Sequence, residues 1–185
     1  MGKGIVDELK KEYTIDDQWL PLEIHPEVPE KGQRVSDLFP GMPLEGMFMN
    51  LSRMGDEYGI SFCGADMMSN THKALLAGEY AKDNGKFHEF HDKIFYEYFT
   101  KGMDINDDQL LASIAGSIGL DKEEMLSKIK AGIYEERLIE AHETARNYNV
   151  NSTPTFIIDD MTVLVGAQPI ASFREAFKSV ESKLR

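Results

Sequence analysis

The stretch Ser152-Thr153-Pro154-Thr155-Phe156 puts a proline at the start of an apolar segment, and it restricts the possible folds more than any other part of the chain. Proline has no backbone N–H, so it belongs at the first residue of a strand or at a sheet edge. Asp159-Asp160 and a second apolar run from Val163 follow, which predicts a β-hairpin. A cis Thr153–Pro154 bond would leave the backbone of Thr153 free to bind an extended peptide or a thiol substrate. An ordinary trans proline is the alternative.

Composition limits the class of protein. A length of 185 residues suits one domain, or one domain with a helical insertion. A net charge of −12 and a pI near 4.8 argue against nucleic acid or an anionic membrane as partner. No apolar run approaches the roughly 20 residues that span a bilayer, and the N-terminus lacks a signal pattern. The single cysteine suits a reducing compartment, so we expect a cytoplasmic protein.

The N-terminal third predicts one helix and one strand. Ile5, Val6 and Leu9 mark one face of a short helix that begins almost at the first residue. Residues 20–24 then alternate between apolar and other side chains, as a half-buried strand requires. Pro21 within this segment favours an edge position or a bulge. A loop rich in proline and glycine follows from Pro26 to Gly46.

The middle of the chain predicts a block of helices. Asn70 is a candidate N-cap for a helix that Gly85 closes. Asn106 with Gln109, and Asp121 with Glu124, have the spacing of capping boxes. They predict helices over residues 107–118 and 122–130, and a longer helix over 133–147 leads back to the Thr153-Pro154 strand.

The order of the C-terminal third carries a resemblance to a known family. A helix, the segment Asn-Val-Asn-Ser-Thr-Pro-Thr-Phe, a hairpin, the turn Gly166–Pro169 and a last helix together resemble the DsbA-like branch of the thioredoxin superfamily, above all its FrnE type. The resemblance extends upstream over nearly all of the chain. It implies an α/β thioredoxin-like fold, with residues 1–69 and 148–185 in the thioredoxin-like domain and residues 70–147 in an inserted helical domain.

One part of the family pattern is absent. The family begins with a strand that leads into a Cys-x-x-Cys motif at the head of its first helix, whereas this chain begins where that helix should already be under way. We therefore expect a shortened chain whose sheet lacks its first strand. Unpaired backbone groups are costly, so the gap predicts a repair. Either residues 20–24 pair with Thr155–Ile158, or a second copy fills the space and forms a homodimer.

Thiol–disulfide exchange by a dithiol enzyme needs an attacking cysteine and a second cysteine that resolves the mixed disulfide. Cys63 is the only cysteine, so we assign no catalytic residue. Two interpretations of Cys63 stay open: a packed thiol without a task, or a single redox-sensitive thiol. The resemblance implies that Thr153 and Pro154 help to bind a peptide or a small thiol or disulfide substrate, and it implies no cofactor.

Histidines offer a competing hypothesis. His88 and His91 lie three residues apart and share one helix face, as two metal ligands would. Phe90 and Ile94 take the core side of this segment, which predicts that both histidines face water and that no metal is bound. Methionines cluster earlier in the chain, and we interpret the cluster as adaptable packing rather than a peptide groove: Met42, Met47, Met49 and Met54.

Three hypotheses of function remain. The first is a FrnE-type, DsbA-like oxidoreductase that is inactive in this form because the dithiol is absent. The second is a glutathione-binding protein that resembles the kappa-class glutathione transferases and the 2-hydroxychromene-2-carboxylate isomerases. The third is a non-catalytic module for dimerisation or peptide binding that accepts a partner's strand at the incomplete sheet.

Overall fold

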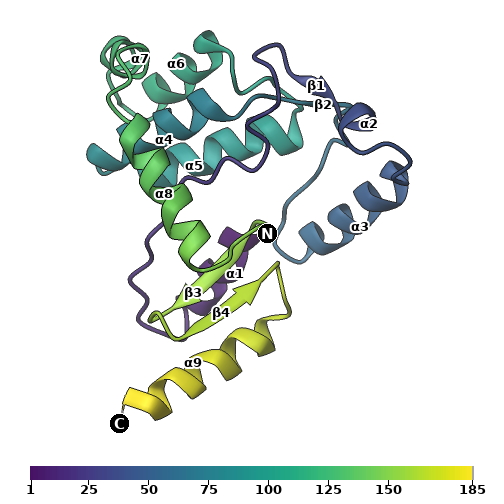
Figure 1. The fold of residues 1–185 in the computed structure, drawn as a ribbon, viewed down its shortest axis with the longest axis vertical. Helices are drawn as coiled ribbons and strands as arrows, with labels where there is room; N and C mark the ends of the chain where they lie inside the picture. The colour runs from purple at the N-terminus through teal and green to yellow at the C-terminus, as the bar shows by residue number, and fades with distance from the viewer. Residues whose placement is uncertain (185) are drawn as a thin grey trace. The chain divides into compact units, whose positions relative to one another are not determined.

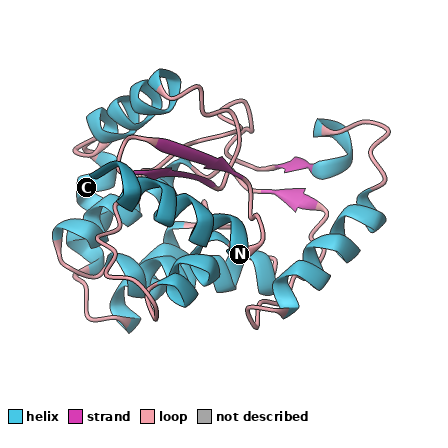
Figure 2. Cartoon of the chain, turned by 90° about the horizontal axis from the view of Figure 1, so that it is seen from below, coloured by secondary structure: helices cyan, strands magenta, loops and turns pink. Residues whose placement is uncertain are grey.

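The computed structural model describes residues 1–184. Helices and loops make up most of the chain, and the strands form two short antiparallel pairs (Figures 1 and 2). In chain order the elements are α1 (Gly2–Leu9), β1 (Gln33–Arg34), α2 (Val35–Leu38), α3 (Leu44–Asp56), β2 (Met67–Met68), α4 (His72–Asp83), α5 (Phe87–Phe95), the π-helix η1 (Tyr96–Thr100), α6 (Asp108–Ser117), α7 (Lys122–Lys130), α8 (Glu135–Asn147), β3 (Thr155–Ile158), β4 (Thr162–Val165) and α9 (Ile170–Leu184).

The chain divides into two compact units. The hairpin unit joins residues 1–19 to the chain from residue 143 onward, and the helical unit comprises residues 20–142. The domain boundaries predicted from the sequence lie elsewhere, because they assign residues 20–69 to the thioredoxin-like part. The predicted boundaries describe the domains of the family, whereas the two units are defined by compactness, so the predicted domains stay a prediction.

The hairpin unit contains the predicted β-hairpin. Strands β3 and β4 pair in antiparallel register, with Thr155 opposite Val165 and Ile158 opposite Thr162. Asp159 and Asp160 make the turn with φ of 46° and 56°, a left-handed conformation that aspartate tolerates better than most residues. The hairpin prediction is therefore confirmed, and the two aspartates are turn residues.

Segments from both ends of the chain form the core of the hairpin unit. Ile5 and Leu9 of α1 are buried, as is Phe173 of α9. The ring of Phe173 meets that of Phe156 edge to face, with centroids 4.8 Å apart. Tyr13, just after α1, stacks on Phe177 at 4.9 Å. The fold of this unit thus depends on contacts between residues that are far apart in the sequence.

The outer edge of β3 has no strand beside it within residues 1–184. The Gly166 N–H donates to the Pro154 carbonyl at 2.8 Å, and the alternation of an antiparallel ladder then turns the backbone groups of Thr155 and Ile157 away from β4. The predicted strand at residues 20–24 is wrong, and it does not pair with β3. These residues belong to no ladder and Leu20 is 54% exposed, because Pro21 cannot donate a ladder bond and no neighbouring strand supplies a partner.

Five α-helices and η1 form the body of the helical unit, around a continuous apolar core. Deeply buried members of this core come from α4, α5, α6, the segment before α8, and α7, and they include Ala77, Tyr80, Phe90, Leu111, Tyr134 and Met125. The predicted helix 122–130 is confirmed, and Asp121 accepts a hydrogen bond from the Glu124 N–H at 2.9 Å. The predicted cap of α6 is wrong by one residue. Asp107 caps that helix, because the amide of Asn106 donates instead to the Glu30 carbonyl.

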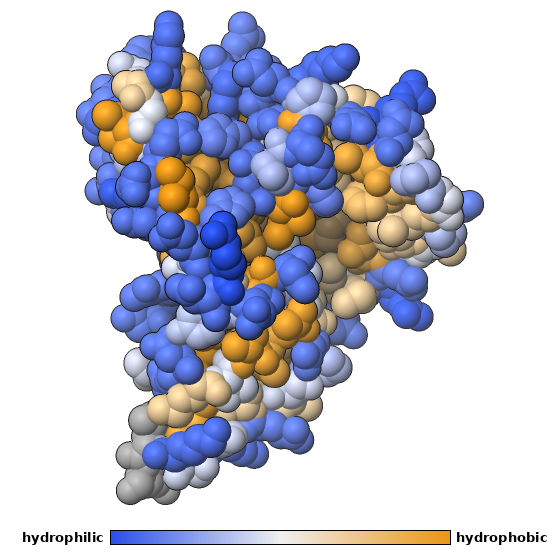
Figure 3. Space-filling model, viewed as in Figure 1, coloured by the Kyte–Doolittle hydropathy of each residue, from blue (hydrophilic) through white to orange (hydrophobic). Residues whose placement is uncertain are grey.

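Helix α3 is loosely attached to the rest of the helical unit. Gly55 is its one buried residue, and apolar atoms gather on the surface over α3 (Figure 3). Met42, Met49 and Met54 are 44%, 65% and 40% exposed. The predicted packing role is therefore wrong for these three methionines, which are exposed, whereas Met47, the fourth of the cluster, is half-buried. None of the helices in the described chain is long and apolar enough to cross a membrane.

Candidate functional site

Pro154 lies against the first residue of α1. The Thr153–Pro154 peptide bond is cis. A Cβ atom built on Gly2 would stand 3.0 Å from the Cβ and 3.3 Å from the Cγ of Pro154, and 3.5 Å from the Phe156 ring. A side chain at residue 2 would require Pro154 to shift by a few tenths of an ångström, so glycine suits this close approach of helix and proline. The sequence thus brings the start of α1 and the start of β3 to one place.

The beginning of α1 offers free backbone donors at this place. Met1 is the N-cap residue and makes no side-chain capping bond, and the first turn carries no acidic residue. Unsatisfied N–H groups give a helix N-terminus a partial positive charge. A thiol at such a position has a lowered pKa and reacts more readily. Met1 and Gly2 carry no titratable side chain, and burial lowers the pKa of the Met1 amino group at this end of α1.

Thr153 has the free backbone that a substrate-binding residue needs. It is exposed, and within the described residues no hydrogen bond to its N–H or C=O is found. The neighbouring backbone is held in place, since the Thr155 hydroxyl donates to the Ser152 carbonyl at 2.8 Å and Pro154 accepts from Gly166. A fixed segment with one free N–H and one free C=O can pair with an extended peptide.

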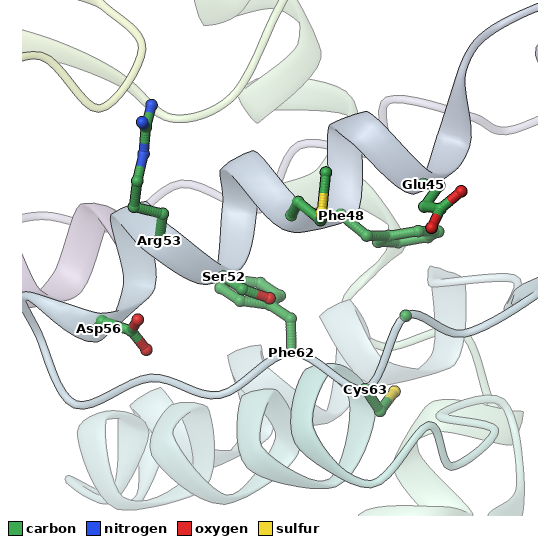
Figure 4. Close-up of a pocket in the computed structure, with 9 residues that line it drawn as sticks. Glu45, Phe48, Ser52, Arg53, Asp56, Phe62 and Cys63 are labelled. Atoms are coloured by element: carbon green, nitrogen blue, oxygen red, sulfur yellow. The ribbon is translucent and has the colours of Figure 1, made fainter.

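Cys63 belongs to the helical unit and lies at the edge of a groove. The groove has a volume of about 470 Å³ and runs between α3 and the extended segment around residue 62 (Figure 4). The ring of Phe62 points toward α3, whereas the Cys63 side chain points away from it. The Cys63 N–H donates to the Phe99 carbonyl in η1 at 2.8 Å. Gly102 lies so close that an added Cβ would be 3.1 Å from the sulfur. The thiol is therefore exposed but fixed by its backbone.

Comparison with known proteins identifies the family. A family model described as a DSBA-like thioredoxin domain matches residues 1–178 of the chain. The chain belongs to this family. The family resemblance inferred from the sequence is thus confirmed at this level, and the chain is a member of the DsbA-like thiol–disulfide oxidoreductases by descent.

Two individual proteins are similar to this chain. The crystal structure of a probable DsbA oxidoreductase from Streptomyces coelicolor matches with a TM-score of 0.86 and 21% identity, over 98% of this chain and 83% of that one. This match shows the fold, a helix-rich α/β thioredoxin-like fold. The uncharacterised protein YwbO of Bacillus subtilis (strain 168) is 26% identical over 189 residues, which cover 99% of this chain and 91% of YwbO.

Pro154 lies against the start of α1. The role of Thr153 and Pro154 in substrate binding, which the resemblance implies, stays a prediction. The structure places these two residues in the hairpin unit and Cys63 in the helical unit. One cysteine can form a mixed disulfide, but a second thiol is needed to resolve it, and this sequence has one cysteine.

The two histidines of α5 do not behave alike in this DsbA-like protein. His88 is exposed, as predicted, but His91 is 8% exposed, so the prediction that His91 faces water is wrong. Position 91 follows Phe87 by one helical turn and therefore lies on the apolar stripe, where its ring lies tilted against that of Phe95 with centroids 3.9 Å apart. Within the described residues no group of three or more acidic, histidine or cysteine side chains could hold a metal.

Sequence reasoning missed a polar cluster around His72. This histidine stands at the start of α4, and its Nδ1 and Nε2 atoms lie 3.3 Å from a Glu23 oxygen and 3.1 Å from a Glu135 oxygen. The three residues are separated by 49 and 63 positions, and no spacing rule connects them. Burial works to lower the pKa of His72, but the two carboxylates outweigh it and raise that pKa above its ordinary value.

Proposed function

We propose that this chain is the substrate-binding scaffold of a FrnE-type, DsbA-like thiol–disulfide oxidoreductase, and that residues 1–185 alone do not catalyse dithiol exchange. Thr153 and Pro154 contact an extended peptide or a small thiol or disulfide substrate. The family membership and the Gly166–Pro169 turn support the FrnE type.

The contact between Pro154 and Gly2 carries the proposal. Pro154, the neighbour of Thr153 in the chain, lies against the first residue of α1, which supports a role of the Thr153 backbone near the positive end of that helix. A substrate strand that pairs with Thr153 would hold its sulfur near the helix end, where a thiolate is stabilised. The site therefore has the means to dock a substrate and to stabilise negative charge on sulfur.

The redox step itself lacks a component within this sequence. A thiolate that attacks a disulfide forms a mixed disulfide and releases one thiolate, and the enzyme turns over when a second cysteine attacks the mixed disulfide. Cys63 can take the first step at most, ending as a capped thiol. This is the role in which Cys63 remains a candidate redox thiol.

Peptide binding tests the docking site. The probe is a short apolar peptide with a central cysteine blocked as a mixed disulfide, and binding is followed by NMR chemical-shift changes. Pro154→Ala removes the ring that lies on Gly2 and should weaken binding by about tenfold, which is about 1.4 kcal/mol. Pro169→Ala makes the same chemical change in an exposed turn of the same unit and should leave the affinity unchanged.

Two outcomes contradict the docking proposal. One is equal affinity of the Pro154→Ala and Pro169→Ala proteins, and the other is a set of shifts confined to the groove beside Cys63. Glutathione in place of the peptide tests the glutathione hypothesis: a rise in melting temperature with glutathione concentration would favour that second class of protein.

Insulin reduction by dithiothreitol tests the claim about catalysis. The chain should leave the rate at the uncatalysed level, and Cys63→Ser should behave like the parent. A rate comparable to that of a dithiol enzyme would contradict the proposal, even if peptide binding at Pro154 holds.

The outer edge of β3 favours a second candidate function, strand exchange with another copy of the chain. Thr155 and Ile157 present backbone donors and acceptors there, and edges of this kind recruit strands. Sedimentation should then show a concentration-dependent dimer, and hydrogen exchange at Thr155 and Ile157 should slow as the dimer forms. A monomer at all concentrations would exclude this function.

A further inference from the structure

Residues 20–24 enter the helical unit without regular structure, and side chains hold them there. No backbone hydrogen bond involves these residues within the described chain. Their single hydrogen bond among the described residues is that of Glu23 to His72. Fastening of this segment by polar contact therefore depends on one side-chain pair.

The His72 ring forms hydrogen bonds to two parts of the chain, one from each ring nitrogen. Nδ1 faces Glu23 in the 20–24 segment, and Nε2 faces Glu135 in the first turn of α8. A neutral imidazole has one N–H and one lone pair, so only the protonated ring donates both bonds. A ring that donates from both nitrogens has no lone pair left for a metal ion.

The charges around His72 act in one direction. Glu23 and Glu135 are the two groups whose charges and hydrogen bonds favour protonation. Lys73, the next residue on α4, bonds to Asp108 of α6 at 2.7 Å. No charged group of α5, α6 or α7 is among the causes that shift the pKa of His72. The two carboxylates alone oppose the effect of burial.

We propose that His72 is a pH-dependent clamp: the imidazolium fastens residues 20–24 to α4 and α8, and deprotonation releases the segment. The two partners respond differently to the loss of a proton. The Glu135 side chain is 45% exposed and reaches water in place, whereas the Glu23 side chain is 10% exposed. When the ring is neutral, the Glu23 carboxylate can face a nitrogen lone pair instead of an N–H group. It can then move away from the ring and into water only if residues 20–24 move with it.

Helix α8 stays in place while the segment moves. Leu138 and Ala141 anchor the helix by burial in the helical unit, so loss of the Glu135 bond does not free it. Residues 20–24 have no comparable anchor, since Leu20 and Ile24 are 54% and 37% exposed. The clamp therefore controls the mobility of the chain directly after Trp19, where one compact unit gives way to the other.

The pH window follows from the direction of the shift. A histidine whose folded pKa is raised stabilises the fold fully below its unfolded pKa of about 6.5, and this contribution is lost as pH rises through the folded pKa. The clamp is closed in mildly acidic solution and opens on the alkaline side of that value.

NMR titration of the whole chain tests the clamp. The His72 ring signal should titrate with a midpoint above about 6.5, and the methyl signals of Leu22 and Ile24 should shift and sharpen with the same midpoint. Fluorescence of Trp19, the sole tryptophan, should report the same transition. Glu23→Gln and Glu135→Gln should each lower the midpoint.

Variants separate the clamp from a general effect of histidine titration. His72→Gln should leave the methyl and fluorescence signals in their released state at every pH, while His88→Gln, at an exposed histidine of α5, should change nothing. A His72 midpoint at or below the ordinary value overturns the proposal. The proposal is also overturned if the methyl signals of Leu22 and Ile24 do not change with pH in the parent protein. This second result does not require any variant to fold.

Discussion

The helical unit and the hairpin unit reach stability by different means. The helical unit builds its core from helices that follow one another along the chain, and two of them begin at a side-chain cap, Asp107 on α6 and Asp121 on α7. The hairpin unit brings residues 1–19 together with residues beyond 143, and its first helix has no side-chain cap. Its strand β3 keeps an outer edge without a partner in the described chain.

The two units differ in the kind of backbone that they leave available for binding. Local contacts satisfy the backbone of the helices in the helical unit, where the irregular residues 20–24 are the exception among the described residues. The hairpin unit retains free groups at Thr153, Thr155 and Ile157 and at the start of α1, all of which can bind another chain. Binding capacity and incomplete pairing occur in the same unit.

Removal of a buried ring should have the largest effect. Phe173→Ala in the hairpin unit and Phe90→Ala in the helical unit each delete a side chain that is 1% exposed, and each should cost about 3–5 kcal/mol of unfolding free energy. Urea unfolding measures the cost and hydrogen exchange locates it. Phe173→Ala should reduce protection from hydrogen exchange in β3 and β4 and leave it unchanged in α4. An equal loss of protection in both units would contradict the conclusion that the two units are stabilised separately. Met161→Ala, at an exposed turn residue, is the control.

Two glycine substitutions should have opposite signs. In Gly2→Ala the new methyl group meets Pro154, and such overpacking costs about 1–3 kcal/mol. In Gly46→Ala, within α3, the methyl meets no atom within 4 Å and should stabilise the helix by about 0.5–1 kcal/mol. Thermal melting of both proteins checks the pair, and a destabilised Gly46→Ala protein would show that α3 is more tightly packed than described.

Loss of a helix cap should have a moderate effect confined to the helical unit. Asp121→Ala removes the acceptor of the Glu124 N–H and should cost about 0.5–2 kcal/mol. Asp121→Asn keeps an acceptor at the same atom position and should cost little. If both variants melt at the same temperature, well below that of the parent, then the charge of Asp121 stabilises the helix and its capping hydrogen bond does not.

The smallest effect should come from an ion pair at the surface of the hairpin unit. A hydrogen bond from Arg174 lowers the pKa of Glu12. A lowered carboxyl pKa gives stability that is present above the unfolded value of about 4.3 and disappears as pH falls through the folded value. Melting temperatures of the parent and Glu12→Gln should therefore differ slightly at neutral pH and converge in acid. The His72 clamp in the helical unit weakens at the alkaline end instead.

Sequence reasoning succeeded where the signal is local. The hairpin with its Asp159-Asp160 turn, the helix 122–130 and the family all follow from short motifs and their order. It failed where a residue's conformation or burial depends on a partner far away in the sequence. Residues 20–24 lack a neighbouring strand, and Asn106 bonds to Glu30 instead of capping α6. His91 is buried in a stripe of aromatic side chains. The His72 cluster had no local signal at all. Thr153 and Pro154 could be named from the motif, but their contact with Gly2 could not.

The tight fit between Gly2 and Pro154 sets a rule for engineering. Any group larger than hydrogen at residue 2 requires the ring to give way by a few tenths of an ångström, so a nucleophile installed there by substitution would strain this contact. A designer who wishes to equip this scaffold with sulfur chemistry does better to place the reactive atom at another position and to leave the glycine untouched.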